Sequence, residues 1–282
     1  MNSLKNKTLL FIDLLLTPLF ASAQPMPGVL SAGKWSHEAV TENITLHQGA
    51  FQGNLFDANQ YLCVLEIAPG VRFDIVPSAE GALETTSSLA ERYGATAAVN
   101  GSFFNMKAPY GSVCYLRVDG EELAPNQGGG DHRPGEHWQG AVATFRGDLY
   151  VLMSDGRPLW EKDIQAEDVL TAGPSLMAAG KVLETRKVRF NTNRHPRTAV
   201  GRRPDGTVVL VVADGRNSSA AGLSIPELQQ VMQALGCTEA LNLDGGGSSA
   251  MVVRGKVVNH PSDNGKFDAE GERPVANAII VK

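Results

Sequence analysis

The chain has 282 residues and a formal net charge of −5 at pH 7. Hydrophobic residues make up 43% of it and charged residues 20%, a balance that excludes a disordered, fibrous or polytopic membrane protein and indicates a globular one. The negative net charge and the lack of any block of lysines and arginines leave no source for the counterion release that drives nucleic-acid binding, so no nucleic-acid partner is expected.

Residues 1–23 have the pattern of an export signal. Two lysines precede a mostly apolar stretch that is too short to span a bilayer, and Ala21-Ser22-Ala23 provides the small residues of a cleavage site. A buried first helix is the alternative, but an aspartate and a proline would interrupt it. We therefore expect a signal peptide that is removed before Gln24, a mature protein without a membrane span, and a periplasmic or secreted location.

The three cysteines do not indicate a disulfide scaffold. Cys63, Cys114 and Cys237 are far apart, and none of them belongs to a C-x-x-C or zinc-type spacing. An odd number of cysteines allows at most one intramolecular disulfide, and the sequence does not choose between the possible pairs. A structural metal site is not expected either.

Much of the chain alternates strand-like runs with glycine turns. Residues 61–68 and 71–76 alternate apolar and polar side chains around Pro69-Gly70, which predicts a strand-turn-strand unit. Further hairpins are predicted at Asp119-Gly120, Gly147-Asp148 and Arg254-Gly255. We interpret residues 24–81 as a β-rich N-terminal extension packed on a domain that comprises residues 82–282.

The helical signals are fewer. Residues 86–93 predict a short helix. Later, a β-branched run at 208–212 predicts a strand, Ser224 and Glu227 have the spacing of a capping box before a helical apolar stripe, and 240–243 predict a second strand. This order predicts a β-α-β crossover with a locally parallel strand pair. The expected fold class is α+β, with a mixed, mostly antiparallel β-sheet core and two or three helices.

Three polar clusters directly follow apolar, strand-like runs. They are Asn100-Gly101-Ser102-Phe103-Phe104, Asp214-Gly215-Arg216 and Asp244-Gly245-Gly246-Gly247-Ser248-Ser249. A side chain at a strand end is held by the sheet, and neighbouring glycines let a phosphate or sulfate approach the backbone amides. Such pairs also form ordinary turns, but three glycines and two serines after Asp244 exceed what a turn requires.

Two further segments contain candidate ligand groups. Arg197 opens a strand-like run, and its guanidinium is either a surface charge or a planar donor to phosphate or carboxylate. Residues 125–138 contain three consecutive glycines and no periodicity, which predicts a long surface loop. His132 and His137 in this loop could bind a metal, but we interpret them as loop residues.

Four motifs, taken in chain order, resemble those of the phosphodiester glycosidase family. They are Asn100-Gly101-Ser102-Phe103-Phe104, Arg197-Thr198-Ala199-Val200-Gly201, Ala213-Asp214-Gly215-Arg216 and Asn242-Leu243-Asp244-Gly245-Gly246-Gly247-Ser248-Ser249. The resemblance also includes Gly222-Leu223-Ser224-Ile225, Pro261-Ser262-Asp263 and Arg273-Pro274-Val275, and it covers residues 83–281. Each motif alone is weak, whereas four in order with the same helix between the last two are a specific signal.

The resemblance implies hydrolysis of a sugar-1-phosphate diester at its glycosidic bond, which releases a free sugar and leaves a phosphomonoester. A phosphate is already a good leaving group, so an anion cradle and carboxylates that stabilise C1 or activate water matter more than a strong general acid. The expected partner is a phosphoglycan or another sugar phosphate. No cofactor is required, and a divalent cation is compatible with this chemistry.

The candidate site residues come from these motifs. The predicted catalytic residues are Asp244, Asp214 and Asp263. The predicted substrate-binding residues are Asn100, Phe103, Arg197, Thr198, Arg216, Gly245, Gly246, Gly247 and Ser248. We expect Arg197 and the three glycines at the phosphate, and Asn100 at a sugar hydroxyl or the phosphate. The sequence leaves open which carboxylate performs which step.

Two other functions could use the same residues. A metal-dependent phosphodiesterase would use Asp214, Asp244 and Asp263 as ligands of a hard cation and would cleave a P–O bond. A non-catalytic envelope protein would use the same cradle only to bind an anionic glycan. The position of bond cleavage separates the first from a glycosidase, and turnover separates the second.

Overall fold

The computed structural model describes residues 26–127 and 136–282. The predicted signal peptide therefore lies outside the described residues, and so do residues 128–135 of the predicted loop, with His132. Among the described residues, no helix is both long and apolar enough to cross a membrane.

The largest sheet has eight strands and positions most of the candidate site. Its spatial order is β1 (Lys34–Thr41), β2 (Ile44–Leu55), β3 (Ala58–Ile67), β16 (Val208–Ala213), β15 (Arg197–Arg202), β17 (Glu239–Asn242), β13 (Ser175–Ala178) and β14 (Lys181–Val182). Each pair of neighbouring strands is antiparallel.

Two five-stranded antiparallel sheets and one short ribbon complete the β-structure. The second sheet has the order β11 (Asp148–Met153), β10 (Gly140–Phe145), β12 (Asp168–Ala172), β8 (Leu116–Val118) and β9 (Glu121–Ala124). The third has the order β19 (Lys256–Val257), β18 (Met251–Val253), β5 (Ala97–Asn100), β20 (Asn277–Val281) and β4 (Phe73–Pro77). Strands β6 (Phe104–Asn105) and β7 (Gly111–Ser112) pair only with each other in the described part of the chain.

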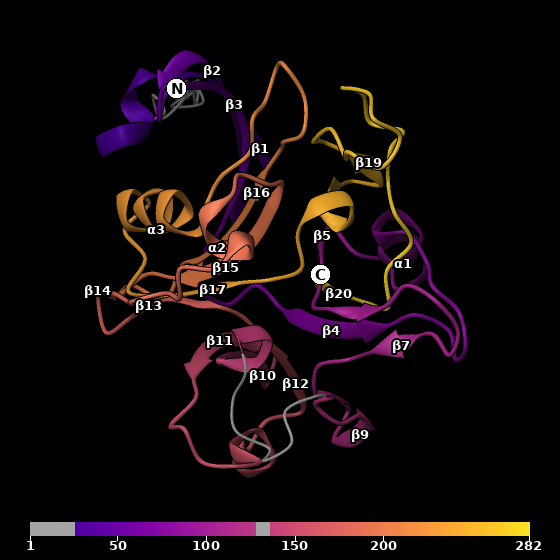
Figure 1. The fold of residues 1–282 in the computed structure, drawn as a ribbon. Coiled ribbons are helices and arrows are strands. Elements are labelled where there is room, and N and C mark those ends of the chain that lie inside the picture. The colour runs from indigo at the N-terminus through magenta and orange to yellow at the C-terminus, as the bar shows by residue number, and fades with distance from the viewer. Residues whose placement is uncertain (1–25, 128–135) are drawn as a thin grey trace, which may run out of the picture.

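The main core lies where the three sheets meet. In β16, Val208, Leu210 and Val212 belong to this core, whereas the alternate residues face a second core on the other side of the sheet. A strand that is buried on both faces needs a continuous apolar run, and this explains the β-branched stretch seen in the sequence. In Figure 1 the second sheet lies at the bottom of the view, and α3 lies at the left.

Helices cover the outer faces of the sheets. The described helices are α1 (Thr86–Arg92), α2 (Arg189–Thr192) and α3 (Ile225–Ala234), with short 3-10 turns η1 (Gly28–Ala32), η2 (Glu136–Trp138), η3 (Trp160–Asp163) and η4 (Gly246–Ser248). The predicted capping box of α3 is confirmed, because the Ser224 side chain accepts from the Glu227 backbone and the Glu227 side chain accepts from the Ser224 backbone. The α+β class is confirmed.

The predicted β-α-β crossover is not confirmed. Helix α3 does connect β16 to β17, but β15 lies between these strands and pairs antiparallel with both. The expected neighbouring parallel pair is therefore absent from the described residues. The two strands predicted on either side of Pro69-Gly70 are confirmed as β3 and β4, but they do not pair with each other: β3 pairs with β2 and β16 on its two edges, and β4 belongs to the third sheet.

The segment before residue 82 contributes strands to two sheets. Strand β3 pairs with β16, and β4 pairs with β20 near the end of the chain. The predicted hairpins are confirmed: Asp119-Gly120 connects β8 to β9, and Arg254-Gly255 connects β18 to β19. The turn between β10 and β11 is Arg146-Gly147, one residue before the predicted Gly147-Asp148.

The three cysteines are free and buried. Burial raises the pKa of Cys114 and of Cys237 to about 12, so both thiols stay protonated at neutral pH. None of the possible disulfides forms in this structure.

Asp168 ties the second sheet to the third and is expected to be important for stability. Its buried carboxylate accepts from the backbone N–H groups of Ile75 and Asp119 and from the Thr144 hydroxyl, at 3.1, 2.9 and 2.8 Å. Asp168→Ala leaves these donors buried without acceptors and is expected to lower the unfolding free energy by about 2 kcal/mol or more. Urea unfolding measures this loss.

Asp148→Ala is the matched control for that experiment. Asp148 lies in the same sheet and is exposed, and its side chain makes no hydrogen bond or ion pair with the described residues. Its removal is expected to change the unfolding free energy by less than about 0.5 kcal/mol. Equal midpoints for the two variants would contradict the role assigned to Asp168.

Candidate functional site

Three neighbouring strands of the eight-stranded sheet bring the main candidate residues to one edge. Asp214 follows the end of β16, Asp244 follows β17, and Arg197 begins the intervening strand β15. Because β15 is antiparallel to both neighbours, its first residue lies beside their last ones: Arg197 pairs with Ala213, and the Leu243 N–H donates to the Thr198 carbonyl at 2.9 Å. The sheet thus brings together three of the sequence motifs.

Asn100 joins this edge from the third sheet. Its Nδ2 donates to the Asp244 carbonyl at 2.8 Å, and its Oδ1 accepts from the Thr198 hydroxyl at 2.7 Å and from the Ala250 N–H at 3.2 Å. Asn100 and Thr198 are fully buried. Both ends of the Asn100 amide are therefore occupied within the protein, where they position the loop that follows β17.

Each glycine of that loop lies against another part of the site. A Cβ on Gly245 would lie 2.7 Å from the Pro196 carbonyl oxygen, and one on Gly246, which has φ +64°, would lie 2.8 Å from the Arg216 guanidinium. A Cβ on Gly247 would overlap both Arg273 and Asp263. The three glycines are needed because two guanidinium groups and a carbonyl approach the backbone here.

The backbone amides of the loop are largely used within the protein. The Gly245 N–H donates to Oδ1 of the preceding residue, Asp244, at 2.9 Å, and the Gly246 N–H donates to the Pro196 carbonyl at 2.9 Å. The Gly247 N–H has no acceptor among residues 26–127 and 136–282. The Ser248 hydroxyl is buried and acts on the Asp244 carboxyl, to which it is a hydrogen-bond donor.

Asp244 is a half-buried carboxyl with a raised pKa. Burial is the main cause of the increase, because it disfavours the charged form. Hydrogen bonds from the Ser248 hydroxyl and the Gly245 N–H and the nearby positive charges of Arg273 and Arg216 counteract it in part. Burial thus opposes ionisation of this carboxyl, whereas its two hydrogen-bond donors and the two arginines favour it.

Asp263 has the opposite environment. It forms an ion pair with Arg273, with 2.5 Å between Oδ1 and Nη2, and this guanidinium holds the pKa of Asp263 below its usual range. The sequence motifs included Arg273, but the residue was not predicted to belong to the site. Its Nε is buried and has no hydrogen-bond partner among the described residues.

His260 is a second residue that the sequence reasoning missed. Its Nδ1 lies 2.7 Å from Asp214 Oδ2, and its backbone N–H also donates to the same carboxylate at 3.0 Å. Asp214 is buried, whereas 23% of the His260 side chain is exposed. With Nδ1–H donated to Asp214, Nε2 is left as the proton acceptor of the ring. The neighbouring Pro261-Ser262-Asp263 motif was the available signal for this residue.

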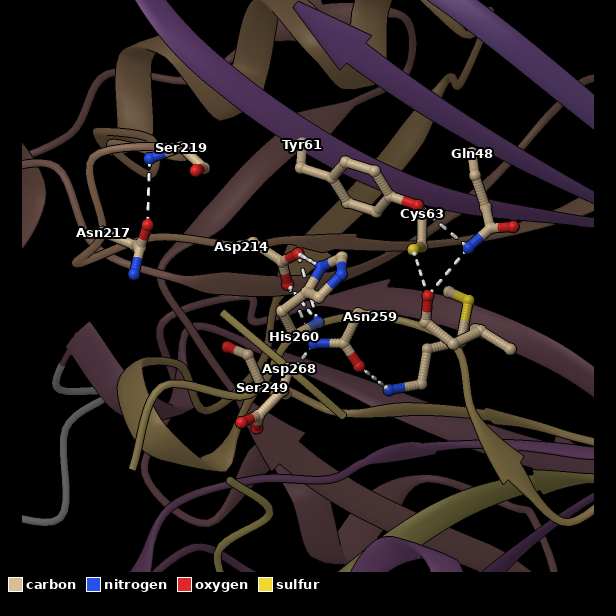
Figure 2. A network of polar contacts seen from close by, with 12 residues as sticks. Gln48, Tyr61, Cys63, Asp214, Asn217, Ser219, Ser249, Asn259, His260 and Asp268 are labelled. Carbon is tan, nitrogen blue, oxygen red and sulfur yellow. Dashed lines mark hydrogen bonds and ion pairs between the residues drawn. The ribbon is translucent and has the colours of Figure 1, made fainter. Parts of the chain in front are cut away.

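A polar network holds the Asp214–His260 pair, as Figure 2 shows. Asn259 Nδ2 donates to Asp214 Oδ1 at 3.0 Å and to the Ser249 carbonyl at 3.1 Å, which links the pair to the glycine loop. The His260 ring stacks on Phe267 with centroids 3.8 Å apart, and Tyr61 meets it edge-on. Burial raises the pKa of Tyr61 to about 12, so its hydroxyl stays neutral.

Arg197 lies behind the glycine loop rather than in front of it. The side chain is buried, and it donates to the backbone carbonyls of Leu223, Phe190 and Asn193 at 2.9, 2.5 and 3.2 Å. Burial, with a smaller contribution from Arg216, lowers the pKa of Arg197 to about 10. This contact set anchors the α2 segment. Arg216, in contrast, is exposed and lies over Gly246.

An aromatic group borders Arg197. The predicted residue Phe103 lies 4.1 Å from the His137 ring and 6.0 Å from the Phe190 ring, measured between centroids. The Arg197 guanidinium lies over the Phe190 ring at 4.7 Å. Phe103 is thus part of a hydrophobic wall near the start of β15.

The three predicted carboxylates do not form a metal centre. Among the described residues, no group of three or more His, Cys, Asp and Glu side chains has an arrangement that could hold a metal ion. Asp214 contacts His260, Asp263 contacts Arg273, and Asp244 accepts from the Gly245 backbone.

Comparison with known proteins identifies the family. The family model described as phosphodiester glycosidase matches residues 93–282. The mouse N-acetylglucosamine-1-phosphodiester alpha-N-acetylglucosaminidase is 38% identical over 68 residues, which is 24% of this chain and 13% of that protein. YomE, an SPbeta prophage-derived uncharacterized protein of Bacillus subtilis, is 43% identical over 70 residues, which is 25% of this chain and 11% of that protein. The matches thus span only a small part of these relatives.

A solved structure has a similar fold. The zebrafish N-acetylglucosamine-1-phosphodiester alpha-N-acetylglucosaminidase catalytic domain, auto-inhibited by its pro-peptide, matches with a TM-score of 0.66 over 89% of this chain and 88% of that one. At 15% sequence identity, this likeness concerns the fold. The family model, which covers most of the chain, confirms the relationship expected from the sequence motifs: the chain belongs to the phosphodiester glycosidase family.

Proposed function

We propose that the protein is an exported hydrolase that cleaves the glycosidic bond of a sugar-1-phosphate diester and releases a free sugar and a phosphomonoester. The observation that carries the proposal is the glycine loop after Asp244, which has Arg216 and Arg273 against its backbone and the Asp214–His260 pair linked to its far end. Family membership and the name of the mouse relative support the same chemistry. The reaction needs no cofactor.

The phosphate is expected at the surface of the glycine loop. Arg216 lies over Gly246 and Arg273 lies over Gly247, so two guanidinium groups meet at the loop whose Gly247 N–H has no acceptor in the described chain. Guanidinium groups and free backbone amides are the groups that bind phosphate oxygens in proteins. The same groups stabilise the additional negative charge that the phosphate gains when the C1–O bond breaks.

The two carboxylates that do not form an ion pair with Arg273 perform the remaining steps. Asp244, ionised, stabilises the positive charge that develops at the anomeric carbon. Asp214 holds the His260 ring through Nδ1, and His260 Nε2 accepts the proton of the attacking water. The water oxygen forms the new bond to C1, and the electron pair of the broken C1–O bond goes to the phosphate. Asp263 holds Arg273 in position.

The assignment of Asp244 predicts an acid limit to activity. The active form is ionised, and burial raises the pKa of Asp244, so kcat/KM is expected to fall on acidification at a higher pH than an ordinary surface carboxyl would give. A pH profile of kcat/KM measures this limb, and it is recorded on the residual activity of His260→Gln, in which protonation of the imidazole cannot cause the fall. A profile that is flat down to the ordinary range of a carboxyl pKa would contradict the assignment.

A substrate panel tests the proposed reaction. The mature protein is incubated with methyl phosphodiesters of several sugar 1-phosphates, and proton NMR follows the anomeric signals. The expected result is loss of the phosphorylated anomeric signal and growth of free-sugar signals. Release of methanol and intact sugar 1-phosphate would instead indicate a phosphodiesterase, and binding without turnover would indicate a glycan-binding protein.

Export is tested separately from catalysis. Cleavage after Ala23 is expected because a small-x-small site ends there, so protein from the periplasm or the medium is expected to begin at Gln24. N-terminal sequencing of that fraction provides the measurement. An intact Met1 terminus in exported protein would contradict the predicted signal peptide.

A further inference from the structure

A pocket of about 450 Å³ adjoins the proposed phosphate position. Residues from three parts of the chain surround it, among them Leu83, Phe104, Met106, Tyr110 and Pro274. Its volume lies within the range of small-molecule sites. None of the predicted substrate-binding residues lines it.

The pocket is continuous with the site through the ion pair of Asp263 and Arg273. Both residues line the pocket, and both also lie against Gly247 of the glycine loop. Arg273 Nη1 lies 3.9 Å from Met106 Sδ, whereas Nη2 binds Asp263. The guanidinium therefore joins the loop on one side and the pocket wall on the other.

The chemistry of the walls is apolar apart from this ion pair. Its other lining residues are glycine, alanine, leucine, phenylalanine, methionine, tyrosine and proline. Met106 and Tyr110 are 60% and 42% exposed, so their side chains are accessible to a ligand in the pocket. A sugar ring with several hydroxyl groups would find few hydrogen-bond partners here, and leaving polar groups unpaired is costly.

We propose that this pocket binds the alcohol portion of the phosphodiester, and that this portion is uncharged and mostly apolar, either aliphatic or aromatic. The inference rests on the proposed function, which places the phosphate at Arg273 and the anomeric carbon at Asp244. A diester with its phosphate at Arg273 extends in two directions, and the pocket receives the group on the side away from Asp244. The pocket thus selects the molecule from which the sugar is released.

Two esters of one sugar phosphate test the proposal. N-acetylglucosamine 1-phosphate is prepared as its methyl and its hexyl diester, and kcat/KM is measured for both. Burial of the additional methylene groups is expected to raise kcat/KM of the hexyl diester by about tenfold or more over the methyl diester. Met106→Ala and Tyr110→Ala are expected to bring this ratio close to one and to leave kcat/KM of the methyl diester unchanged.

Val182→Ala is the matched control. Val182 is an equally exposed hydrophobic residue, at 45%, on β14, and its loss is expected to leave the ratio unchanged. A ratio near one in the wild-type protein, with the methyl diester hydrolysed, would overturn the pocket assignment and leave the proposed function intact.

Binding of the product tests the pocket without turnover. Calorimetry with hexyl phosphate and methyl phosphate is expected to show tighter binding of the hexyl compound to the wild-type protein and no preference in Met106→Ala. If neither diester is hydrolysed but the binding preference is found, the pocket assignment stands and the proposed reaction fails. Equal binding of the two compounds would overturn the pocket assignment.

Discussion

Asp244→Asn is expected to lower kcat/KM by ~10²-fold to 10⁴-fold and to leave the fold intact. The carboxylate lies at the end of β17, half-buried and beside a glycine loop that two guanidinium groups border. The amide keeps the volume and can still accept from the Gly245 N–H, but it removes the negative charge that stabilises the anomeric carbon. Steady-state kinetics and thermal unfolding are measured on the same preparation.

Asp119→Asn is the control for this substitution. Asp119 is exposed in the turn between β8 and β9, where its φ of 51° suits asparagine as well as aspartate. Neither activity nor stability is expected to change. Wild-type kcat/KM in Asp244→Asn would contradict the assigned role, and failure of that variant to fold would make Asp244 a structural residue.

His260→Gln alone is expected to lower kcat by ~10²-fold or more, because it removes the proposed base. Asp214 acts through His260 by holding Nδ1 at 2.7 Å, so Asp214→Asn is expected to have a comparable effect on kcat. Because the two residues act as one unit, the double variant is expected to be no slower than the slower single variant.

Comparison of the two single variants with the double variant separates an effect on catalysis from an effect on stability. Asp214 also accepts from Asn259 and from the His260 backbone, so Asp214→Asn is expected to lower the melting temperature as well. His260→Gln leaves those bonds in place and is expected to affect stability less. Losses in kcat that multiply in the double variant would contradict the coupled role of the pair.

Local sequence signals predicted the elements whose geometry depends on nearby residues. The capping box of α3 and the turns after β8 and β18 formed as expected, because each is fixed by a few neighbouring side chains or by glycine. The pairing of strands was less predictable. The apolar pattern of β16 and β17 indicated strands, but it did not indicate that β15, which precedes both, lies between them.

The same distinction applies to the site. Asp214 and Asp244 could be selected because each ends a buried strand beside glycine, and the antiparallel order of β16, β15 and β17 explains why they share one edge. His260 and Arg273 lie in a long irregular segment after β19. Their place in the site depends on contacts with residues elsewhere in the chain, such as that of His260 with Asp214. No local pattern encodes those contacts.

The burial of Arg197 could not be predicted from the sequence either. Its position at the start of a strand suggested a phosphate ligand, yet its guanidinium donates to backbone carbonyls of the α2 segment and of Leu223. Those acceptors lie in α2, in the residue after it and in the segment before α3, and the sequence did not indicate where these segments lie relative to Arg197. Arg216 and Arg273 are the arginines that approach the glycine loop.

The most direct test of the proposed reaction is the site of oxygen incorporation. Hydrolysis of a sugar-1-phosphate methyl diester is carried out in water enriched in oxygen-18, and both products are analysed by mass spectrometry. Attack of water on C1, as proposed for His260 and Asp244, places the heavy oxygen in the released sugar and leaves methyl phosphate unlabelled. Label in the phosphate would mean that the P–O bond is cleaved and would contradict the glycosidase mechanism.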